Sequence, residues 1–482
     1  MKFKSVRLLI VFFTFIALYV IVIGRLFYFQ VVLAQVFRDV GKSQSSDVLE
    51  LDSGRGDIVF SDGFPLSTNK TTYLLYANPK VIKDRLEHAE KLSPILEIDP
   101  ATISARLKQD LFWVKLKDKI DEPTKVGFQK QDLRYYPEAS MSAHVVGFVG
   151  KNDQGEARGY FGLEGFYNKQ LMGRPGRRYL IKDALGNPIL TDIREEETIE
   201  GRDLILGIDR SVQFYAEKRL KNGLEKYEAE GGTIIVMESK TGKILAMASY
   251  PQFNPQAYND FDYNSYKNPA LSNVFEPGST FKVLVMAAAI DRDLVKPDTK
   301  CSVCGGPVSI GGYTIKTWND KYYENSTMTD VIKHSDNTGM VFISQKLGLN
   351  GLIEYFEKLG LMELTGIDLQ GEVIGEIRPR DSWYPIDVAT ASFGQGISLT
   401  PIQLITAVNT IPSGGYLLQP YVVSQIIDGN RTIEIKSKVK RQVFDSKTTK
   451  LLTWMMVNAI ENGESKWVKI PGHEIAGKTG TA

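Results

Sequence analysis

The sequence has 482 residues, of which 43% are hydrophobic and 24% are charged. That balance excludes a disordered chain, and the length predicts two or three folded domains. The net charge of +1 favours neither nucleic acid nor a strongly acidic protein as a partner. The two cysteines, Cys301 and Cys304, have no histidines spaced to complete a zinc site with them. The sequence therefore predicts no metal and no cofactor, and this pair is a local disulfide or two free thiols.

The N-terminus has the pattern of a membrane anchor. Lys2, Lys4 and Arg7 precede an uncharged apolar run over residues 8–24, and more apolar residues follow Arg25. Such a run is just long enough to span a bilayer as a helix. The basic flank predicts a single-pass protein of the cell membrane with a cytoplasmic N-terminus and an extracytoplasmic remainder. A cleaved signal peptide is the alternative, but no A-x-A pattern of small residues follows the run.

Glycine and proline residues divide the rest of the chain. Residues 1–28 are predicted to form the cytoplasmic tail and anchor, and residues 29–48 an amphipathic and then polar stem. Residues 49–215 mix short apolar runs with Gly/Pro turns, which is typical of an extended α+β module. Residues 216–482 form the last predicted domain.

The entry to this last domain has a clear local pattern. The sequence predicts a helix over residues 212–227, followed by strands over 233–237 and 243–248. The connection over residues 238–242 has turn chemistry, so the two strands are expected to form a β-hairpin.

A candidate nucleophile lies further along the chain. Pro277-Gly278 breaks the preceding structure, and Ser279 then stands at the start of an apolar, alanine-rich helix. Lys282, three residues on, lies on the same face of that helix. A serine hydroxyl needs a neighbouring base, and a lysine whose pKa is lowered by burial can serve as one. The helix N-terminus also favours negative charge that develops there.

The S-x-x-K spacing alone does not select Ser279, because it also occurs at Ser67 and Ser437. Ser67 stands in a turn-rich stretch and Ser437 in a charged one, and neither precedes an apolar helix. Both are therefore predicted to be solvated surface. A K-T-G tripeptide over residues 240–242 falls in the predicted hairpin turn, where a structural role is expected.

Two further motifs follow Ser279 in order. They are Ser335-Asp336-Asn337 and Lys478-Thr479-Gly480. S-x-x-K, S-D-N and K-T-G form the motif set of penicillin-binding proteins and class A β-lactamases.

The chain resembles the class B penicillin-binding proteins, monofunctional D,D-transpeptidases of peptidoglycan synthesis, and the division type is favoured over the elongation type. The resemblance covers nearly the whole chain, with segments at 55–58, 134–137, 162–165, 171–173, 206–209, 241–246, 393–396 and 400–403. Residues 61–63 depart from the family's usual Asp-Arg-x-Gly turn. The resemblance implies an α+β multidomain fold with a transmembrane helix, an elongated pedestal and a transpeptidase domain like the serine β-lactamases. In that domain helices flank an antiparallel sheet.

The resemblance also implies five catalytic residues. Ser279 would attack the D-Ala-D-Ala end of a stem peptide and form an acyl-enzyme, which the amine of a neighbouring stem peptide resolves. Lys282 would be the base, Ser335 a proton relay, Asn337 a holder of the substrate amide, and Lys478 a source of positive potential. A serine at a helix start is often only a cap, but the two matching motifs favour catalysis.

Substrate binding is implied at the end of the chain. Thr479 would bind the terminal carboxylate, with Gly480 beside it, and the N–H groups of Ser279 and Thr481 would form an oxyanion hole. His334 and His473 could indicate a Ser-His triad, but a lysine base makes one unnecessary. The aromatic stretch 313–323 is expected to form a cleft wall.

Other readings stay open. The same motifs occur in β-lactam sensors and β-lactamase-like hydrolases, and a non-catalytic scaffold of the wall-synthesis complex is a third possibility. The resemblance further implies β-lactams, a membrane glycosyltransferase and division or elongation proteins as partners. Because the family continues beyond K-T-G, the sequence also predicts an incomplete domain whose residues 474–482 begin a strand.

Overall fold

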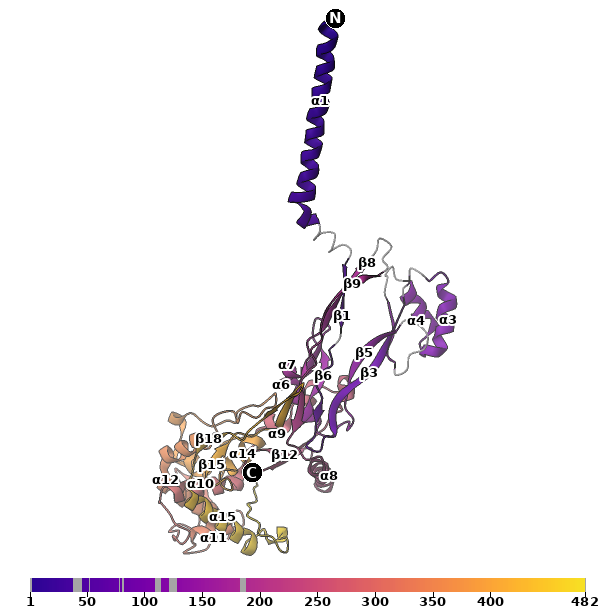
Figure 1. Ribbon diagram of the computed structural model, residues 1–482. Helices are drawn as coiled ribbons and strands as arrows, with labels where there is room; N and C mark the ends of the chain where they lie inside the picture. Colours follow the sequence, from indigo (N-terminus) through magenta and orange to yellow (C-terminus); the bar gives the residue numbers. More distant parts are fainter. Residues whose placement is uncertain are drawn as a thin grey trace. The chain divides into compact units, whose positions relative to one another are not determined.

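The computed structural model describes residues 2–37, 46–51, 53–77, 79, 82–108, 114–120, 128–182 and 188–481. Its contacts divide the chain into two compact units (Figure 1). The first contains Met1–Gly54 and Gly173–Glu200, and the second contains Arg55–Met172 and Gly201–Ala482.

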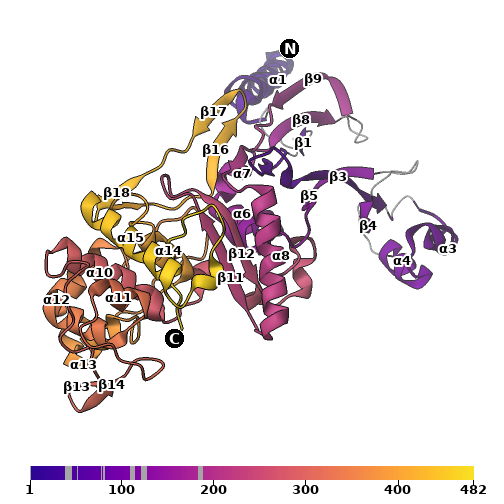
Figure 2. The same ribbon diagram turned by 90° about the horizontal axis from the view of Figure 1, so that it is seen from below.

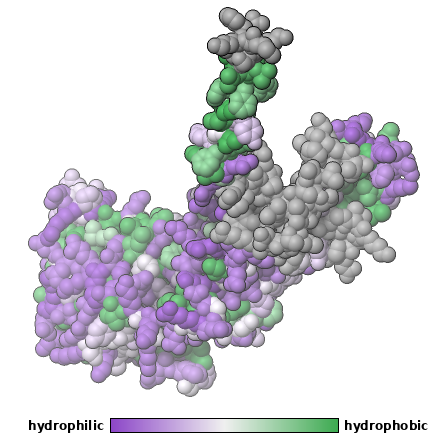
Figure 3. Space-filling view, turned by 45° about the horizontal axis from the view of Figure 1, so that its top comes forward, coloured by the Kyte–Doolittle hydropathy of each residue, from purple (hydrophilic) through white to green (hydrophobic). Residues whose placement is uncertain are grey.

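The first unit begins with a long apolar helix. α1 (Lys2–Phe27) continues as the π-helical turn η1 (Tyr28–Val32), and its apolar side chains are exposed (Figure 3). Leu8–Val32 is long and apolar enough to cross a membrane, as the sequence predicts. The unit also holds an antiparallel sheet of order β1-β8-β9, formed by Ser46–Leu51, Gly176–Lys182 and Pro188–Glu196. Residues 38–45 of the predicted stem lie outside the described residues.

The second unit contains a seven-stranded sheet built from distant parts of the chain. Its order is β17-β16-β10-β2-β3-β4, and β5 also pairs with β3. Among the described strands of this sheet, only β2 and β10 run parallel to each other. The strands are β2 (Ile58–Val59), β3 (Pro65–Ala77), β4 (Val114–Ile120), β5 (Phe128–Tyr135), β10 (Asp203–Leu206), β16 (Val423–Asp428) and β17 (Arg431–Glu434).

Short elements cover this sheet and fill its core. Buried Ile103 and Leu107 pack with Leu75 and Leu116 of the sheet, which places α4 against it. The elements in this region are α3 (Arg85–Leu96), α4 (Pro100–Leu107), α5 (Ala143–Val146), β6 (Phe148–Lys151), β7 (Ala157–Tyr160), α6 (Gly162–Phe166) and α7 (Asn168–Leu171).

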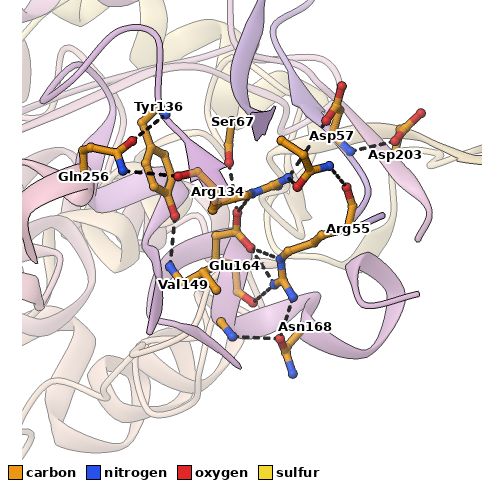
Figure 4. A network of polar contacts seen from close by, with 12 residues as sticks. Arg55, Asp57, Ser67, Arg134, Tyr136, Val149, Glu164, Asn168, Asp203 and Gln256 are labelled. Atoms are coloured by element: carbon orange, nitrogen blue, oxygen red, sulfur yellow. Dashed lines mark hydrogen bonds and ion pairs between the residues drawn. The ribbon is translucent and has the colours of Figure 1, made fainter. Parts of the chain in front are cut away.

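A buried carboxylate, Glu164, lies at the centre of a polar network in this unit (Figure 4). Arg55 Nε donates to Glu164 Oε2 at 2.7 Å, and Arg134 Nε donates to Oε1 at 2.7 Å. Burial alone would raise the pKa of Glu164, but the two guanidinium groups outweigh it and hold that pKa below its ordinary value. Three of the segments that carry the family resemblance therefore meet in one contact.

This network corrects the prediction for Ser67. Its side chain is fully buried in β3, and Oγ donates to Glu164 Oε1 at 3.0 Å. The prediction of solvated surface is wrong because a distant carboxylate supplies the hydroxyl with a partner. Ser437 is exposed, as predicted.

The predicted hairpin and helix at the entry to the last domain are both present. β11 (Gly232–Met237) pairs antiparallel with β12 (Ile244–Tyr250), and α8 (Arg210–Tyr227) lies along β12 (Figure 2). Alanines of α8 and β12 form a small buried core between them. The side chain of Asp209 accepts the Val212 N–H and caps the helix. The K-T-G copy at residues 240–242 lies in the hairpin turn, as expected.

Helices form the remainder of the unit. α10 (Lys282–Asp291) is buried over Lys282–Ile290 and forms the centre of the largest apolar core. Around it lie α11 (Met328–Lys333), α12 (Asn337–Lys358), α13 (Pro385–Ala391), α14 (Pro401–Val408) and α15 (Ser446–Asn462), whereas α9 (Pro269–Ser272) packs with β11 and β12 in a separate core. The 3₁₀ turns are η2 (Pro255–Asp260), η3 (Tyr263–Tyr266), η4 (Gly278–Phe281), η5 (Arg380–Ser382) and η6 (Lys466–Val468).

Two small antiparallel pairs complete the unit: the hairpin of β13 (Val308–Ile310) with β14 (Tyr313–Ile315), and β15 (Tyr416–Leu418) with β18 (Val439–Gln442). The fold is therefore α+β and multidomain, as predicted. One local expectation is wrong, because residues 474–481 form no strand. A strand needs a ladder of backbone hydrogen bonds, and no described strand pairs with this segment.

Candidate active site

Ser279 stands in a tight turn that two glycines make possible. It belongs to η4 and directly precedes α10, so the helix begins at Lys282 rather than at the serine. Gly278 has φ +53° and donates its N–H to Gly394 O at 3.0 Å. A Cβ on Gly394 would lie 2.2 Å from Gly278 O. The loop at residues 393–396 therefore supports the turn that carries Ser279.

Lys282 is completely buried beneath this turn. Its Nζ donates to Ser335 O at 2.6 Å, to Asn337 Oδ1 at 2.7 Å and more weakly to Ser335 Oγ at 3.3 Å. Burial, together with the charge of Lys478, lowers the pKa of Lys282 to about 7, although Asp336 and Glu464 oppose this shift. Near neutral pH, Lys282 is therefore a neutral amine in about half of the molecules and can accept a proton there.

Ser335 and Asn337 lie where one helix ends and the next begins. Ser335, with φ +54°, falls between α11 and α12. Asp336 caps α12 by accepting the N–H groups of Thr338 and Gly339 at 2.7 and 3.3 Å. Asp336 therefore has a structural role at the start of α12.

Lys478 reaches the same group from the end of the chain. Its Nζ donates to Ser335 Oγ at 2.9 Å and to Thr479 O at 3.0 Å. Burial lowers the pKa of Lys478 to about 8, and the carboxylate of Glu464 opposes the shift. Ser335 Oγ thus lies within hydrogen-bonding distance of both lysines.

These groups surround one hollow of about 620 Å³, which we call the active-site hollow. Its lining includes three of the predicted catalytic residues and all three predicted substrate-binding residues. The lining residues are Ser279, Trp318, Ser335, Asn337, Phe393, Gln395, Glu464, Thr479, Gly480 and Thr481. Lys282 lies beneath it, and the structure therefore brings every predicted site residue to one place. Among the described residues, the half-buried Ser279 has no hydrogen-bond partner for its Oγ, and it lines the hollow.

The hollow also contains side chains that the motifs do not identify. Trp318 comes from the aromatic stretch that the sequence predicts as a cleft wall. Glu464 is the one acidic residue of the lining, and no motif in the sequence marks it. The preceding residue, Gly463, packs closely against the end of α11, because a Cβ there would lie 2.8 Å from Lys333 O. This close approach places Glu464 at the hollow.

The histidines do not support a triad. His334 stacks on Tyr323 with ring centroids 4.4 Å apart, and burial lowers its pKa. Within the part of the chain that the structure describes, its ring forms no hydrogen bond to Ser279. Cys301 and Cys304 form a disulfide, which settles the alternative left open by the sequence. No group of three or more metal-binding side chains occurs among the described residues.

The comparisons with known proteins agree with this arrangement. Residues 232–482 match the penicillin binding protein transpeptidase domain, and residues 50–206 match the penicillin-binding protein dimerisation domain. Stage V sporulation protein D of Bacillus subtilis is 30% identical over 99% of this chain and 76% of its own length. Peptidoglycan D,D-transpeptidase FtsI of Escherichia coli is 28% identical over 95% of this chain and 78% of its own.

Solved structures show the same fold. A peptidoglycan synthetase from Bifidobacterium adolescentis has a TM-score of 0.73 and 26% identity, and the match covers 90% of this chain and 85% of that one. Penicillin binding protein 3 from Mycobacterium tuberculosis has a TM-score of 0.68 and 25% identity, over 90% and 82%. The chain therefore belongs to the class B penicillin-binding proteins, in which a dimerisation domain precedes a transpeptidase domain.

Proposed function

We propose that the chain is a peptidoglycan D,D-transpeptidase that cross-links stem peptides through an acyl-enzyme on Ser279 and is inhibited by β-lactams. The main support is the hydrogen-bond network of Lys282, Ser335, Asn337 and Lys478 beside Ser279. It combines a hydroxyl that lines the hollow, a buried amine with a pKa of about 7 and a second lysine. These are the parts that nucleophilic acyl transfer needs.

Acylation begins with proton transfer from Ser279 to the neutral amine of Lys282, while Oγ bonds to the carbonyl carbon of the penultimate D-alanine. The N–H groups of Ser279 and Thr481 stabilise the oxyanion. Thr479 and Gly480 hold the substrate's terminal carboxylate, which the charge of Lys478 favours. The amide bond then breaks, and D-alanine leaves after its nitrogen receives a proton through Ser335.

Transfer reverses these proton movements. The amine of a second stem peptide attacks the ester carbonyl, its proton passes to the lysine and serine network, and Ser279 Oγ is released as a hydroxyl. Asn337 holds both the substrate amide and Lys282 in place. No metal or cofactor takes part in this scheme.

We also infer the setting of the enzyme. α1 anchors it in the cell membrane, with the N-terminus in the cytoplasm and the catalytic part outside. Residues 1–28 form the tail and anchor, 29–48 the stem, 49–215 the pedestal and 216–482 the transpeptidase domain. A membrane glycosyltransferase and proteins of the division complex, rather than of the elongation complex, are the proposed partners.

Labelling with a fluorescent penicillin tests the nucleophile. The full chain in detergent should form one stable adduct, and the Ser279→Ala variant should form none. Mass spectrometry should locate the adduct on the peptide that contains Ser279. Adduct that turns over within seconds would favour a β-lactamase-like hydrolase, and absence of labelling would favour a scaffold.

Cross-linking is tested separately with a donor that ends in D-Ala-D-Ala and an acceptor amine. Release of D-alanine should equal formation of the cross-linked product. Release of D-alanine without product would contradict the transpeptidase proposal.

A further inference from the structure

Glu464 places a free carboxylate in the active-site hollow. It is exposed, lies in the turn that follows α15, and lines the hollow together with Ser279. The chain is held on both sides of it, because Gly463 packs against the backbone of Lys333 and Ser465 is buried. Among the described residues, the carboxylate of Glu464 forms no hydrogen bond and no ion pair.

This carboxylate acts on both lysines of the site without contacting either. It opposes the lowering of the pKa of Lys282 and of Lys478, so it lies within electrostatic range of each. It is also the one acidic residue of the lining. The neighbouring acid, Asp336, is buried and caps α12. The hollow therefore contains one free negative charge beside two positive groups.

The reacting end of the donor does not account for that charge. In the proposed reaction, the D-Ala-D-Ala end carries a carboxylate that Thr479 and Lys478 hold, and a β-lactam also carries a carboxylate. A further carboxylate in the hollow repels both of these ligands. The other reactant is the acceptor amine, and an alkyl amine holds its proton up to about pH 10. The acceptor is therefore the reactant that Glu464 attracts.

A cationic acceptor also needs such a group. To reach the ester on Ser279, it must approach Lys282 and Lys478, whose protonated forms repel it. A carboxylate in the lining offsets this repulsion and raises the local concentration of cations. Since Glu464 has no partner in the protein, an ammonium can bind it without displacing another contact.

We propose that Glu464 binds the ammonium group of the acceptor stem peptide and thereby selects a cationic amine to resolve the acyl-enzyme. This inference rests on the proposed function, because it names the residue of the same site that recognises the second substrate. The bound ammonium first loses one proton to solvent. Its nitrogen then bonds to the ester carbonyl carbon, and the bond from that carbon to Ser279 Oγ breaks. The second proton passes through the lysine and serine network to Oγ.

Competition between two acceptors for one acyl-enzyme tests the inference. The full chain in detergent is acylated at about pH 8 with a thioester donor that carries no amine, and both acceptors are then added. The charged acceptor is a peptide with one free amine, on a lysine or a diaminopimelate side chain, whichever the wild type uses. The neutral acceptor is hydroxylamine, which is uncharged at this pH. Because both products come from the same intermediate, their ratio does not depend on the rate of acylation.

The ratio of the two products measures the preference for a cationic acceptor. This preference should fall about tenfold in Glu464→Gln, the scale of one hydrogen bond to a charged group. It should fall further in Glu464→Lys, where the new charge repels the acceptor. Glu230→Gln is the matched control, because it removes an exposed carboxylate beyond the end of α8 and outside the lining of the hollow. It should keep the wild-type preference.

Three results would overturn this inference alone. The first is an unchanged preference in Glu464→Gln, which is expected if Glu464 only supports the fold or activates water. The second is an equal fall in Glu230→Gln, which would come from net charge rather than from the site. The third is a preference in Glu464→Lys as high as that of Glu464→Gln. Absence of transfer from the wild type to every acceptor would overturn the proposed function and, with it, this inference.

Discussion

Replacing Lys282 with methionine should abolish acylation and yet stabilise the fold at neutral pH. Methionine is close to lysine in length and removes a completely buried amine. In the unfolded chain, Lys282 holds its proton up to about pH 10.5, whereas in the folded protein its pKa is about 7. At pH 7 this difference costs the wild type about 4 kcal/mol of folding free energy, at about 1.4 kcal/mol per pH unit.

Lost hydrogen bonds offset part of that gain. Ser335 O and Asn337 Oδ1 each lose a donor, at about 1 kcal/mol each, while Ser335 Oγ keeps its bond from Lys478. The expected net stabilisation is therefore about 2 kcal/mol at pH 7. It should fall to zero at about pH 9 and become a loss of about 2 kcal/mol by pH 10.5, because the stability of the wild type rises with pH throughout the range in which its unfolded state binds the extra proton.

Thermal unfolding of the full chain at pH 7 and at pH 10 measures this effect. Lys450→Met, at an exposed position of α15, is the matched control and should change stability by less than about 0.5 kcal/mol. A Lys282→Met protein that melts below the wild type at pH 7 would refute the reasoning. An equal gain at both pH values would also refute it, since the gain would then not come from the proton.

Four further outcomes are expected. The rate of penicillin acylation should rise about tenfold per pH unit up to a midpoint near pH 7 and then level off, as the neutral amine of Lys282 forms. Glu464→Gln should move that midpoint to lower pH, because the carboxylate of Glu464 favours the ammonium form of Lys282. An unmoved midpoint in stopped-flow measurements would contradict this expectation. Glu164→Ala should cost about 3–5 kcal/mol in denaturant unfolding, because it removes the carboxylate that pairs with Arg55 and leaves the buried Arg134 with its longer, 3.9 Å ion pair to Asp57. The wild type should keep this stabilisation down to pH 4.5, the ordinary pKa of a glutamate, and lose it as the pH falls further through the lowered pKa of Glu164. A loss that begins above about pH 6 would argue against this role of Glu164. Gly394→Ala should slow acylation at least about tenfold, because the new Cβ would lie 2.2 Å from the backbone oxygen of Gly278. The control is Gly223→Ala, whose new Cβ would lie in open space, and it should be acylated at the wild-type rate.

Much of this arrangement is predictable from local sequence. The helix α8 and the hairpin β11–β12 follow from apolar periodicity and turn residues, which act over a few positions. Ser279 is distinguished from Ser67 and Ser437 by the apolar helix that follows it, and the structure buries that helix over Lys282–Ile290. The motif order then identifies Ser335 and Lys478 as its neighbours, although nothing local predicts the distances between them.

The remainder depends on contacts between distant segments. Ser67 was predicted to be solvated because no residue near it in sequence shows that Glu164 will accept its hydroxyl. Glu464 carries no pattern of its own, and its place in the active-site hollow follows from the close approach of Gly463 to Lys333. The strand expected at residues 474–481 needed a neighbouring strand, which sequence periodicity does not supply.

The placement of the site at helix ends has a consequence for folding. Ser279 precedes α10, Ser335 separates α11 from α12, and Lys478 follows α15, so each helix can form before the three segments meet. Contacts between distant segments form late, because the entropy of closing long loops opposes them. Penicillin labelling would therefore report the completion of folding, and a variant that acquires its label slowly would identify a step in assembly rather than a defect in chemistry.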